Sequence, residues 1–215
     1  MGKFRSLIYF TGRTGNVVGR KGPNGEFITS MHQPTVNQPN TEAQQALKAK
    51  LKLVSSTVNK FVAIAKDNMV CQNGRNYWQE LIAANLDEAV TGSLDPGFEI
   101  DFSKLCIANG ALDLPFNAQG SVDSNTLSLT WADNSGMGNA KATDSVYAVM
   151  YDKEKALMVY GRVGSRSERT GTLTIPTAWN SDNIEVWLYV RNESTRNESK
   201  TYSVSSTQYI GSYTV

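Results

Sequence analysis

The sequence predicts an α+β protein with a glycine-rich N-terminal arm, two helices and a C-terminal antiparallel, immunoglobulin-like β-sandwich. Three observations favour this fold class. Six glycines fall within the first 30 residues, apolar residues recur every three or four positions between residues 41 and 90, and from about residue 98 they recur at every second position. The first period is typical of helices and the second of strands. We therefore expect a basic arm and linker over 1–40, a helical segment over 41–97 and the β-sandwich over 98–215.

The arm joins short β-prone pieces through its glycines. The pieces are Leu7 to Thr11, Asn16 to Val18 and Glu26 to Thr29, and Gly22 to Gly25 have the composition of a tight turn. Because the arm has few large apolar residues, we expect it to be ordered only by pairing with the edge of a sheet, its own or a neighbour's. Residues 30–40 contain two prolines and are expected to form an extended linker.

Two helices are expected next. Thr41 and Gln44 fit a capping box at the start of the first, which spans 41–66. The second spans about 75–90, and Gly92 and Pro96 are expected to end it. The first helix has an apolar face of Leu47, Leu51, Val54, Val58, Phe61, Val62 and Ala65. The second has an apolar face of Tyr77, Trp78, Leu81, Ile82 and Leu86.

The C-terminal half has the regular strand spacing that is typical of an antiparallel sandwich. Alternating apolar residues such as Leu127, Leu129 and Trp131 indicate strands with one buried face. The expected strands are Phe98 to Ile107, Leu127 to Trp131, Val146 to Tyr151, Ala156 to Arg162, Gly171 to Ile175, Ile184 to Arg191, Thr201 to Ser205 and Tyr209 to Val215.

Composition bounds the class of protein. The chain has 215 residues, of which 40% are hydrophobic and 19% charged, which suits one substantial domain with an extension. The longest apolar run near the N-terminus, Leu7 to Phe10, is far shorter than the roughly 20 residues of a membrane-spanning helix. We therefore expect no membrane span and no signal peptide, and a cytoplasmic or virion location.

Charge is distributed unevenly along the chain. Residues 1–66 carry ten Lys and Arg against two acidic residues, whereas the remainder carries eleven basic and eighteen acidic residues. Three interpretations stay open: a basic arm that binds nucleic acid, attraction between the basic end of one subunit and the acidic body of the next, or a merely solvated charge distribution. The candidate contacts of the arm with acidic partners are Lys3, Arg5, Arg13, Arg20 and Lys21.

Motifs that would carry catalysis are weak. Gly12 to Lys21 does not have the spacing of a phosphate-binding loop. His32 lies in the polar linker without an adjacent nucleophile, and one histidine with two cysteines, Cys71 and Cys106, excludes most zinc sites. We expect the two thiols to be free and buried. Glu99 and Asp101 share a strand face, but they do not identify a glycosidase pair.

Polar loops and aromatic residues complete the candidates. Asp133 to Asn139, with Asp144 beyond, has enough oxygen ligands for calcium but not the EF-hand spacing, and a long turn is favoured. Asn192 and Asn197 begin formal glycosylation sequons, which without a signal peptide indicate only a polar loop. Aromatic residues that would form a ligand platform if exposed, but that we expect mostly in the core, are Trp179, Trp187, Tyr189, Tyr202, Tyr209 and Tyr213.

Six segments carry a resemblance to a known family: Met1 to Lys3, Gly15 to Gly19, Pro39 to Gln45, Ala89 to Gly92, Thr130 to Lys141 and Ile210 to Ser212. On these segments the chain resembles an uncharacterised family (a domain of unknown function) of about this length, found in Bacteroidota and their mobile elements. The resemblance covers nearly the full length. It implies the same architecture and an absence of catalytic residues, and it implies no particular activity.

These observations favour a non-enzymatic structural protein that self-assembles through its arm, such as a phage virion coat or decoration protein or a filament subunit. Its partner would be another copy of itself, with no cofactor, metal or membrane involved. The arm strands that would pair with a neighbour are Leu7, Ile8, Tyr9, Phe10, Val17 and Val18. Two alternatives stay open: a β-sandwich that binds a carbohydrate or other ligand, and a nucleic-acid binder that uses residues 1–66.

Overall fold

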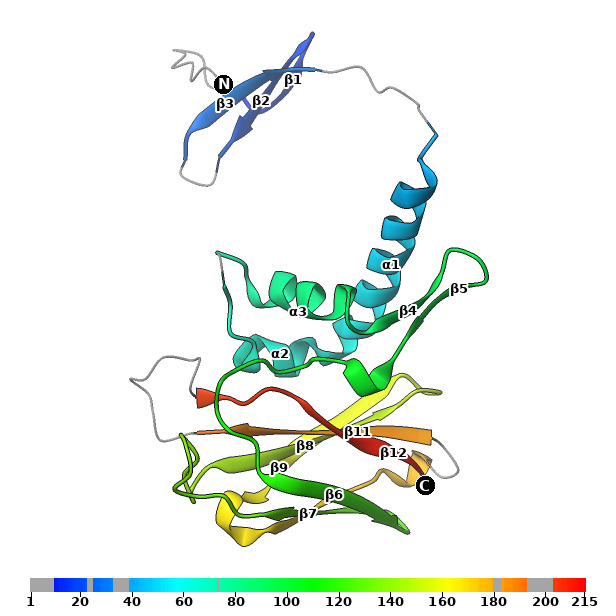
Figure 1. The fold of residues 1–215 in the computed structure, drawn as a ribbon. Helices are drawn as coiled ribbons and strands as arrows, with labels where there is room; N and C mark the ends of the chain where they lie inside the picture. The colour runs from blue at the N-terminus through cyan, green and yellow to red at the C-terminus, as the bar shows by residue number, and fades with distance from the viewer. Residues whose placement is uncertain (1–9, 23–24, 33–38, 73, 180–182, 193–202) are drawn as a thin grey trace. The chain divides into compact units, whose positions relative to one another are not determined.

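The computed structural model describes residues 10–22, 25–32, 39–72, 74–179, 183–192 and 203–215. The chain divides into two compact units, Met1–Thr41 and Glu42–Val215. The first unit contains a small sheet, and the second contains helices and antiparallel sheets (Figure 1). The expected α+β class of antiparallel sheets with two helical stretches is confirmed.

The small sheet of the first unit, called the N-terminal sheet below, has three antiparallel strands in the order β1-β2-β3. They are β1 (Gly12–Thr14), β2 (Val17–Lys21) and β3 (Phe27–Met31). A two-residue turn joins β1 to β2, and Gly15 adopts a φ of 59° there, a conformation that favours glycine. The expected strand at Leu7 to Thr11 is not where the sheet begins: Leu7 to Tyr9 lie outside the described residues, and Phe10 and Thr11 precede β1.

The two expected helical stretches are present with shifted ends. The first is α1 (Glu42–Val58), followed by a 3₁₀ turn, η1 (Asn59–Phe61), and α2 (Val62–Asn68). The second is α3 (Tyr77–Leu86), which begins with a capping box between Asn76 and Gln79. The second helix was expected to run to residue 90, but a hairpin of β4 (Val90–Ser93) and β5 (Gly97–Ile100) starts there instead.

Two further sheets lie C-terminal to this hairpin. One has the order β10-β7-β6, with β6 (Phe116–Asp123), β7 (Thr126–Ala132) and β10 (Thr170–Thr174). The other has the order β12-β11-β8-β9, with β8 (Ser145–Asp152), β9 (Leu157–Ser165), β11 (Asn183–Arg191) and β12 (Gln208–Thr214). Short 3₁₀ turns lie between strands, at η2 (Phe102–Lys104), η3 (Arg166–Glu168) and η4 (Thr177–Trp179).

Two strand predictions were wrong at least in part, and one strand of the two C-terminal sheets was not predicted. The expected strand at Phe98 to Ile107 ends at Ile100, because Asp101 caps η2 by accepting a hydrogen bond from the Ser103 amide. Strand β6 was not predicted, since its sequence is mostly polar and contains Gly120. Thr201 and Tyr202 lie outside the described residues, and Val204 and Ser205 form only isolated bridges.

The four-stranded sheet has a hydrophobic core on each face. One core lies between the two sheets and includes Leu129 of β7, Ala148 of β8 and Leu188 of β11. The other lies between the four-stranded sheet and the helices, and there Phe61 packs against Tyr151 and Trp187 with ring centroids 5.2 and 5.6 Å apart. In the second unit, the helices, the four-stranded sheet and the β10-β7-β6 sheet therefore form three layers (Figure 1).

This layering corrects the expected alternation in β11. The sequence predicted one buried face, formed by Ile184, Val186, Leu188 and Val190. In the structure the intervening side chains of Glu185, Trp187 and Tyr189 are also buried, because the helical layer covers them. Within the described residues, no helix combines the length and the apolar character needed to cross a membrane.

Candidate functional site: the two faces of the N-terminal sheet

The N-terminal sheet carries the described part of the expected assembly residues. Phe10 lies half-buried just before β1, Arg13 lies in β1, and Val17, Val18, Arg20 and Lys21 lie in β2. The other five expected contact and strand residues lie outside the described residues; they are Lys3, Arg5, Leu7, Ile8 and Tyr9.

Strand register divides the described side chains between two faces. Residues directly opposite one another on paired strands share a face, and successive residues of one strand alternate. Arg13 pairs with Val18, and Arg20, two residues further along β2, pairs with Ile28. The two arginines therefore lie on the same face, which we call the basic face, and both are exposed.

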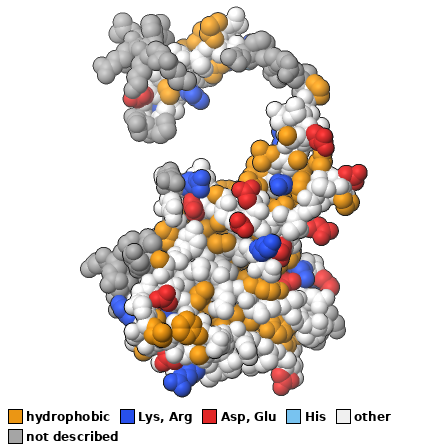
Figure 2. All heavy atoms as spheres, in the orientation of Figure 1, with side chains coloured by type: hydrophobic (Ala, Val, Ile, Leu, Met, Phe, Trp, Pro, Cys, Tyr) orange, Lys and Arg blue, Asp and Glu red, His pale blue; other side chains and the backbone are white. Residues whose placement is uncertain are grey.

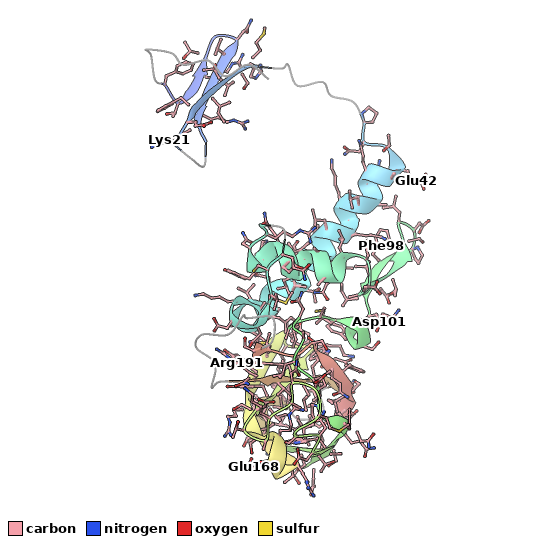
Figure 3. The ribbon with its side chains drawn as sticks, turned by 60° about the vertical axis from the view of Figure 1, so that its left-hand side comes forward. Lys21, Glu42, Phe98, Asp101, Glu168 and Arg191 are labelled. Atoms are coloured by element: carbon pink, nitrogen blue, oxygen red, sulfur yellow. The ribbon has the colours of Figure 1, made fainter. Side chains whose placement is uncertain are left out.

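The opposite face, called the apolar face below, carries a different set. Val17 pairs with Met31, and Lys21 at the end of β2 (Figure 3) pairs with Phe27. Met31 is 77% exposed, Val17 40% and Phe27 36%. The structure thus separates Lys21 from the two arginines with which the sequence grouped it, and it places three apolar side chains on the surface of the sheet. Hydrophobic side chains are visible on the surface of this unit in Figure 2.

Gly19 allows Phe10, just before β1, to lie directly against β2. It lies in β2 between Val18 and Arg20, and it is the only buried residue of β1, β2 and β3. A Cβ at this position would lie 2.3 Å from the Phe10 carbonyl oxygen and 2.9 Å from Cε2 of the Phe10 ring. Because a Cβ cannot approach backbone so closely, the contact requires glycine. Since Gly19 shares the face of Val17, the Phe10 ring extends the apolar face.

The structure of this segment also differs from a phosphate-binding loop. Gly12 to Lys21 forms the β1–β2 hairpin and not a strand–loop–helix unit. His32 directly follows β3, where its backbone N–H donates to the Asn16 carbonyl oxygen at 2.6 Å. The position of His32 is therefore explained by backbone pairing.

The two cysteines are free thiols. The expectation that both are buried was wrong for Cys71, which is exposed, and only partly right for Cys106, which is half-buried. Burial raises the pKa of the Cys106 thiol, so this group is less reactive than an ordinary thiol. Among the described residues, no group of three or more His, Cys, Asp and Glu side chains is placed to hold a metal ion.

The loop considered for calcium holds a buried ion pair that the sequence did not reveal. Arg166 is fully buried; its Nη2 lies 3.1 Å from Oδ2 of Asp144, and its Nη1 donates to Asn134 Oδ1 at 2.5 Å. Nη2 also donates to the Asp113 carbonyl oxygen at 2.6 Å. Asp133 instead accepts hydrogen bonds from Ser135, which lower its pKa. Asp133 Oδ1 and Asp144 Oδ2 are thus used within the protein, as in a structured turn, whereas Asp144 Oδ1 is buried without a hydrogen-bond partner among the described residues.

The aromatic candidates that the structure describes do not form an exposed platform. Trp179, Trp187 and Tyr189 are buried, Tyr209 and Tyr213 are half-buried, and Tyr202 lies outside the described residues. Trp187 Nε1 donates to the Phe102 carbonyl oxygen, and Tyr209 Oη donates to Oε2 of the buried Glu185 at 2.6 Å. Trp187, Tyr189 and Tyr209 are thus part of the core between helices and sheet, whereas Trp179 and Tyr213 belong to the core between the two C-terminal sheets.

The remaining polar candidates do not form a site together. Glu99 is exposed on β5, whereas Asp101 caps η2 and accepts from Ser103, which lowers its pKa. Asn192 is buried and its N–H donates to the Ser203 carbonyl oxygen, while Asn197 lies outside the described residues. A shallow pocket of about 480 Å³ lies where β6 and β12 begin; its walls include Pro115, Phe116, Met137 and Gln208.

Comparison with known proteins supports family membership without an activity. No curated protein sequence matches the chain. A family model described as "Family of unknown function (DUF6266)" matches residues 9–211. The match spans the described N-terminal sheet, the helices and nearly all of the two C-terminal sheets. The chain therefore belongs to this family of unknown function, DUF6266.

Proposed function

We propose that this chain is a non-enzymatic structural protein that self-assembles through its N-terminal sheet, as a virion coat or decoration protein or a filament subunit of a Bacteroidota mobile element. The observation that carries the proposal is the contrast between the two units. The N-terminal sheet has one buried residue, a glycine, in its three strands, whereas the second unit has a hydrophobic core on each face of its central sheet.

A sheet of this size gains little from folding alone. Small two- and three-stranded sheets need a hydrophobic face or packing against another element for independent stability. The described strands bury no large side chain, and Met31 and Val17 stay exposed. Binding to a second copy would bury these side chains, so assembly would supply the stability that the isolated unit lacks.

The second unit suits a structural role as a rigid body. We propose that its two larger sheets form an immunoglobulin-like sandwich, and the strand order supports this assignment. Naming β6 to β12 as A, B, C, C′, E, F and G gives the sheets E-B-A and G-F-C-C′, an arrangement found in this class of sandwich. The buried Arg166–Asp144 pair joins the loop after β7 to η3 and gives this body a defined geometry.

The proposed mode of assembly modifies the expected strand donation in one respect. Val17 and Val18 lie in β2, the central strand, whose two edges already pair with β1 and β3. Strand addition to a neighbour would therefore use β1 or β3, which lie at the edges of the N-terminal sheet.

The mass of the particle in solution tests the proposal. Light scattering after size-exclusion chromatography should give the full chain a mass several times that of one copy, while a chain of residues 42–215 should be a folded monomer. The truncated chain keeps all four tryptophans, so its unchanged fluorescence spectrum is the control for folding. A monomeric full chain over a wide range of concentration, or a truncated chain that assembles normally, would overturn the proposal.

Nucleic-acid binding is a second candidate, which the basic face favours. Arg13 and Arg20 lie on the same exposed face of the N-terminal sheet, where both can reach one phosphate backbone. Absorbance at 260 and 280 nm across the same chromatographic peak tests this candidate. Bound nucleic acid would raise the 260 nm signal, and an Arg13→Ser/Arg20→Ser variant should lose that signal without a change in assembly.

A further inference from the structure

We infer that the N-terminal sheets of two copies stack through their apolar faces, with the basic faces turned outward. The inference rests on the proposed self-assembly and names the surface that carries it. The partner is the same face of a second chain, and the contact is made by side chains rather than by an added strand. Its central residues are Val17 and Met31, which lie directly opposite one another on β2 and β3.

Exposure marks this face as the contact. Met31 is 77% exposed and Val17 is 40% exposed, and the two form an apolar row over β2 and β3, beside Thr14 on β1. The Phe10 ring lies over Gly19 on the same face, next to this row. Burying such side chains between two sheets stabilises the complex in proportion to the apolar area removed from water.

Charge favours a second copy as the occupant. Arg13 and Arg20 lie on the other face, so two apolar faces can meet without bringing the four arginines of a pair together. Stacked sheets lie about 10 Å apart, and the two basic faces would then point away from one another on the outer sides. Lys21 is on the apolar face but at the end of β2, away from the row of Val17 and Met31.

Symmetry adds to this argument. Every copy presents the same apolar row, and a two-fold axis through the contact makes the surface its own partner. No second protein with a complementary face is needed. The exposed Leu47 and Leu51 side chains on α1 are another apolar surface that could bind the apolar face of a neighbour. Lys48 and Lys52 lie beside them, however, and their positive charge would repel the basic residues of the arm.

The area limits the strength of the contact. Three strands about 4.8 Å apart and five residues long present roughly 200–300 Å² of one face, whereas stable interfaces bury about 800 Å² on each partner. One stacked pair should therefore be weak and should dissociate on dilution. Larger assemblies would add further contacts to it.

Adjacent cysteines on opposite faces of β3 provide the test. In the full chain with Cys71→Ser and Cys106→Ala, the Met31→Cys variant should form a disulfide-linked dimer with copper phenanthroline at least ten times faster than the matched Ser30→Cys variant. Both side chains are exposed and lie on the same strand, so only the face differs. Unchanged tryptophan fluorescence reports that the second unit is folded in both variants.

The outcomes separate this inference from the proposed function. Fast dimer formation by Met31→Cys alone supports face-to-face stacking. Equally fast dimer formation by both variants indicates pairing of β3 edges. Slow dimer formation by both variants, in a chain that still assembles, indicates a contact elsewhere. Either result overturns the inference and leaves self-assembly intact. Slow rates together with a monomeric chain overturn both.

A charge substitution gives an independent readout. Met31→Glu places two like charges across the two-fold contact, and sedimentation velocity should show at least a tenfold increase in the concentration needed for half-association. Ser30→Glu, on the basic face, should leave that concentration unchanged or lower it. An equal effect of the two substitutions would contradict stacking through the apolar face.

Discussion

Strands β2 and β11 are both inner strands of antiparallel sheets, yet their surroundings differ completely. β11 is buried over seven consecutive residues, because helices cover one face of its sheet and a second sheet covers the other. β2 has the same backbone pairing on both edges but one buried residue. The comparison shows that strand pairing alone satisfies the backbone, and that burial comes from layers stacked on the faces. A strand without such layers is a surface that needs a partner.

The largest effect should come from the buried ion pair of the second unit. Arg166→Met leaves the carboxylate of Asp144 buried without its cation, which costs about 3–5 kcal/mol of unfolding free energy. Urea unfolding followed by tryptophan fluorescence measures this loss, and Arg169→Met, at an exposed position in the same turn, is the control. Similar stability of the two variants would mean that the pair contributes little.

A cavity in the core between the sheets should have the next largest effect. Leu188→Ala removes a fully buried side chain from β11, and such truncations cost about 2–5 kcal/mol. Leu157→Ala on β9, where the side chain is 54% exposed, should change the unfolding free energy by less than about 0.5 kcal/mol.

A truncation in the N-terminal sheet should not affect the second unit. Val17→Ala should leave the urea midpoint of the second unit unchanged, and a lower midpoint would contradict the separation of the units.

Alkaline pH should destabilise the second unit through the buried Tyr189 and the half-buried Tyr209. Burial, and for Tyr209 the adjacent Glu185 carboxylate, raise the pKa of Tyr189 and Tyr209 well above the usual 10. Since the folded pKa is raised, this contribution is fully present below about pH 10 and is lost as pH rises above it, where the unfolded chain ionises first.

Tyr209→Phe tests this dependence. The variant loses the hydrogen bond to Glu185 and should be about 1–2 kcal/mol less stable at pH 8. Between pH 8 and pH 11, however, its urea midpoint should fall less than that of the unchanged chain. Tyr160→Phe, at a 44% exposed position, is the matched control. A parallel decline in all three chains would show that Tyr209 does not contribute.

The smallest effect on the second unit should come from Gly19→Ala. The added methyl group would overlap the Phe10 backbone, so it should loosen the N-terminal sheet and speed tryptic cleavage after Arg20 and Lys21 several-fold. The urea midpoint reported by tryptophan should not move. Ser30→Ala, which meets no such obstacle, is the control. Equal cleavage rates in the two variants would mean that the Phe10–Gly19 contact does not order the sheet.

Much of the secondary structure follows from local patterns. The spacing of Leu47, Val54 and Val58 identifies a helix, and the alternation of Leu127, Leu129 and Trp131 identifies β7. Strand β6 was missed because Gly120 and polar neighbours give it no apolar run, and β4 was missed because Thr91, Gly92 and Ser93 give it none either. Its partner β5 lies largely within the strand expected at Phe98 to Ile107. Both β4 and β6 depend on pairing that a single-sequence pattern does not identify.

The candidate site was predicted in part. Sequence composition identified the basic, glycine-rich segment, but it grouped Arg13, Arg20 and Lys21 as one set of contacts. The pairing of Arg13 with Val18 and of Lys21 with Phe27 separates them onto two faces. Met31, the most exposed apolar residue of the sheet, was not singled out, because a lone methionine in a polar stretch carries no pattern.

By itself the sequence determined the α+β class, the helical stretches, most of the strands and the charge difference between the two ends of the chain, because these depend on residue spacing and composition. The tertiary structure alone decided which strands are neighbours, that Arg166 meets Asp144 across 22 residues, and that β11 is buried on both faces. The physical reason is that register and layering bring together residues far apart in the chain, and no local pattern encodes such distances.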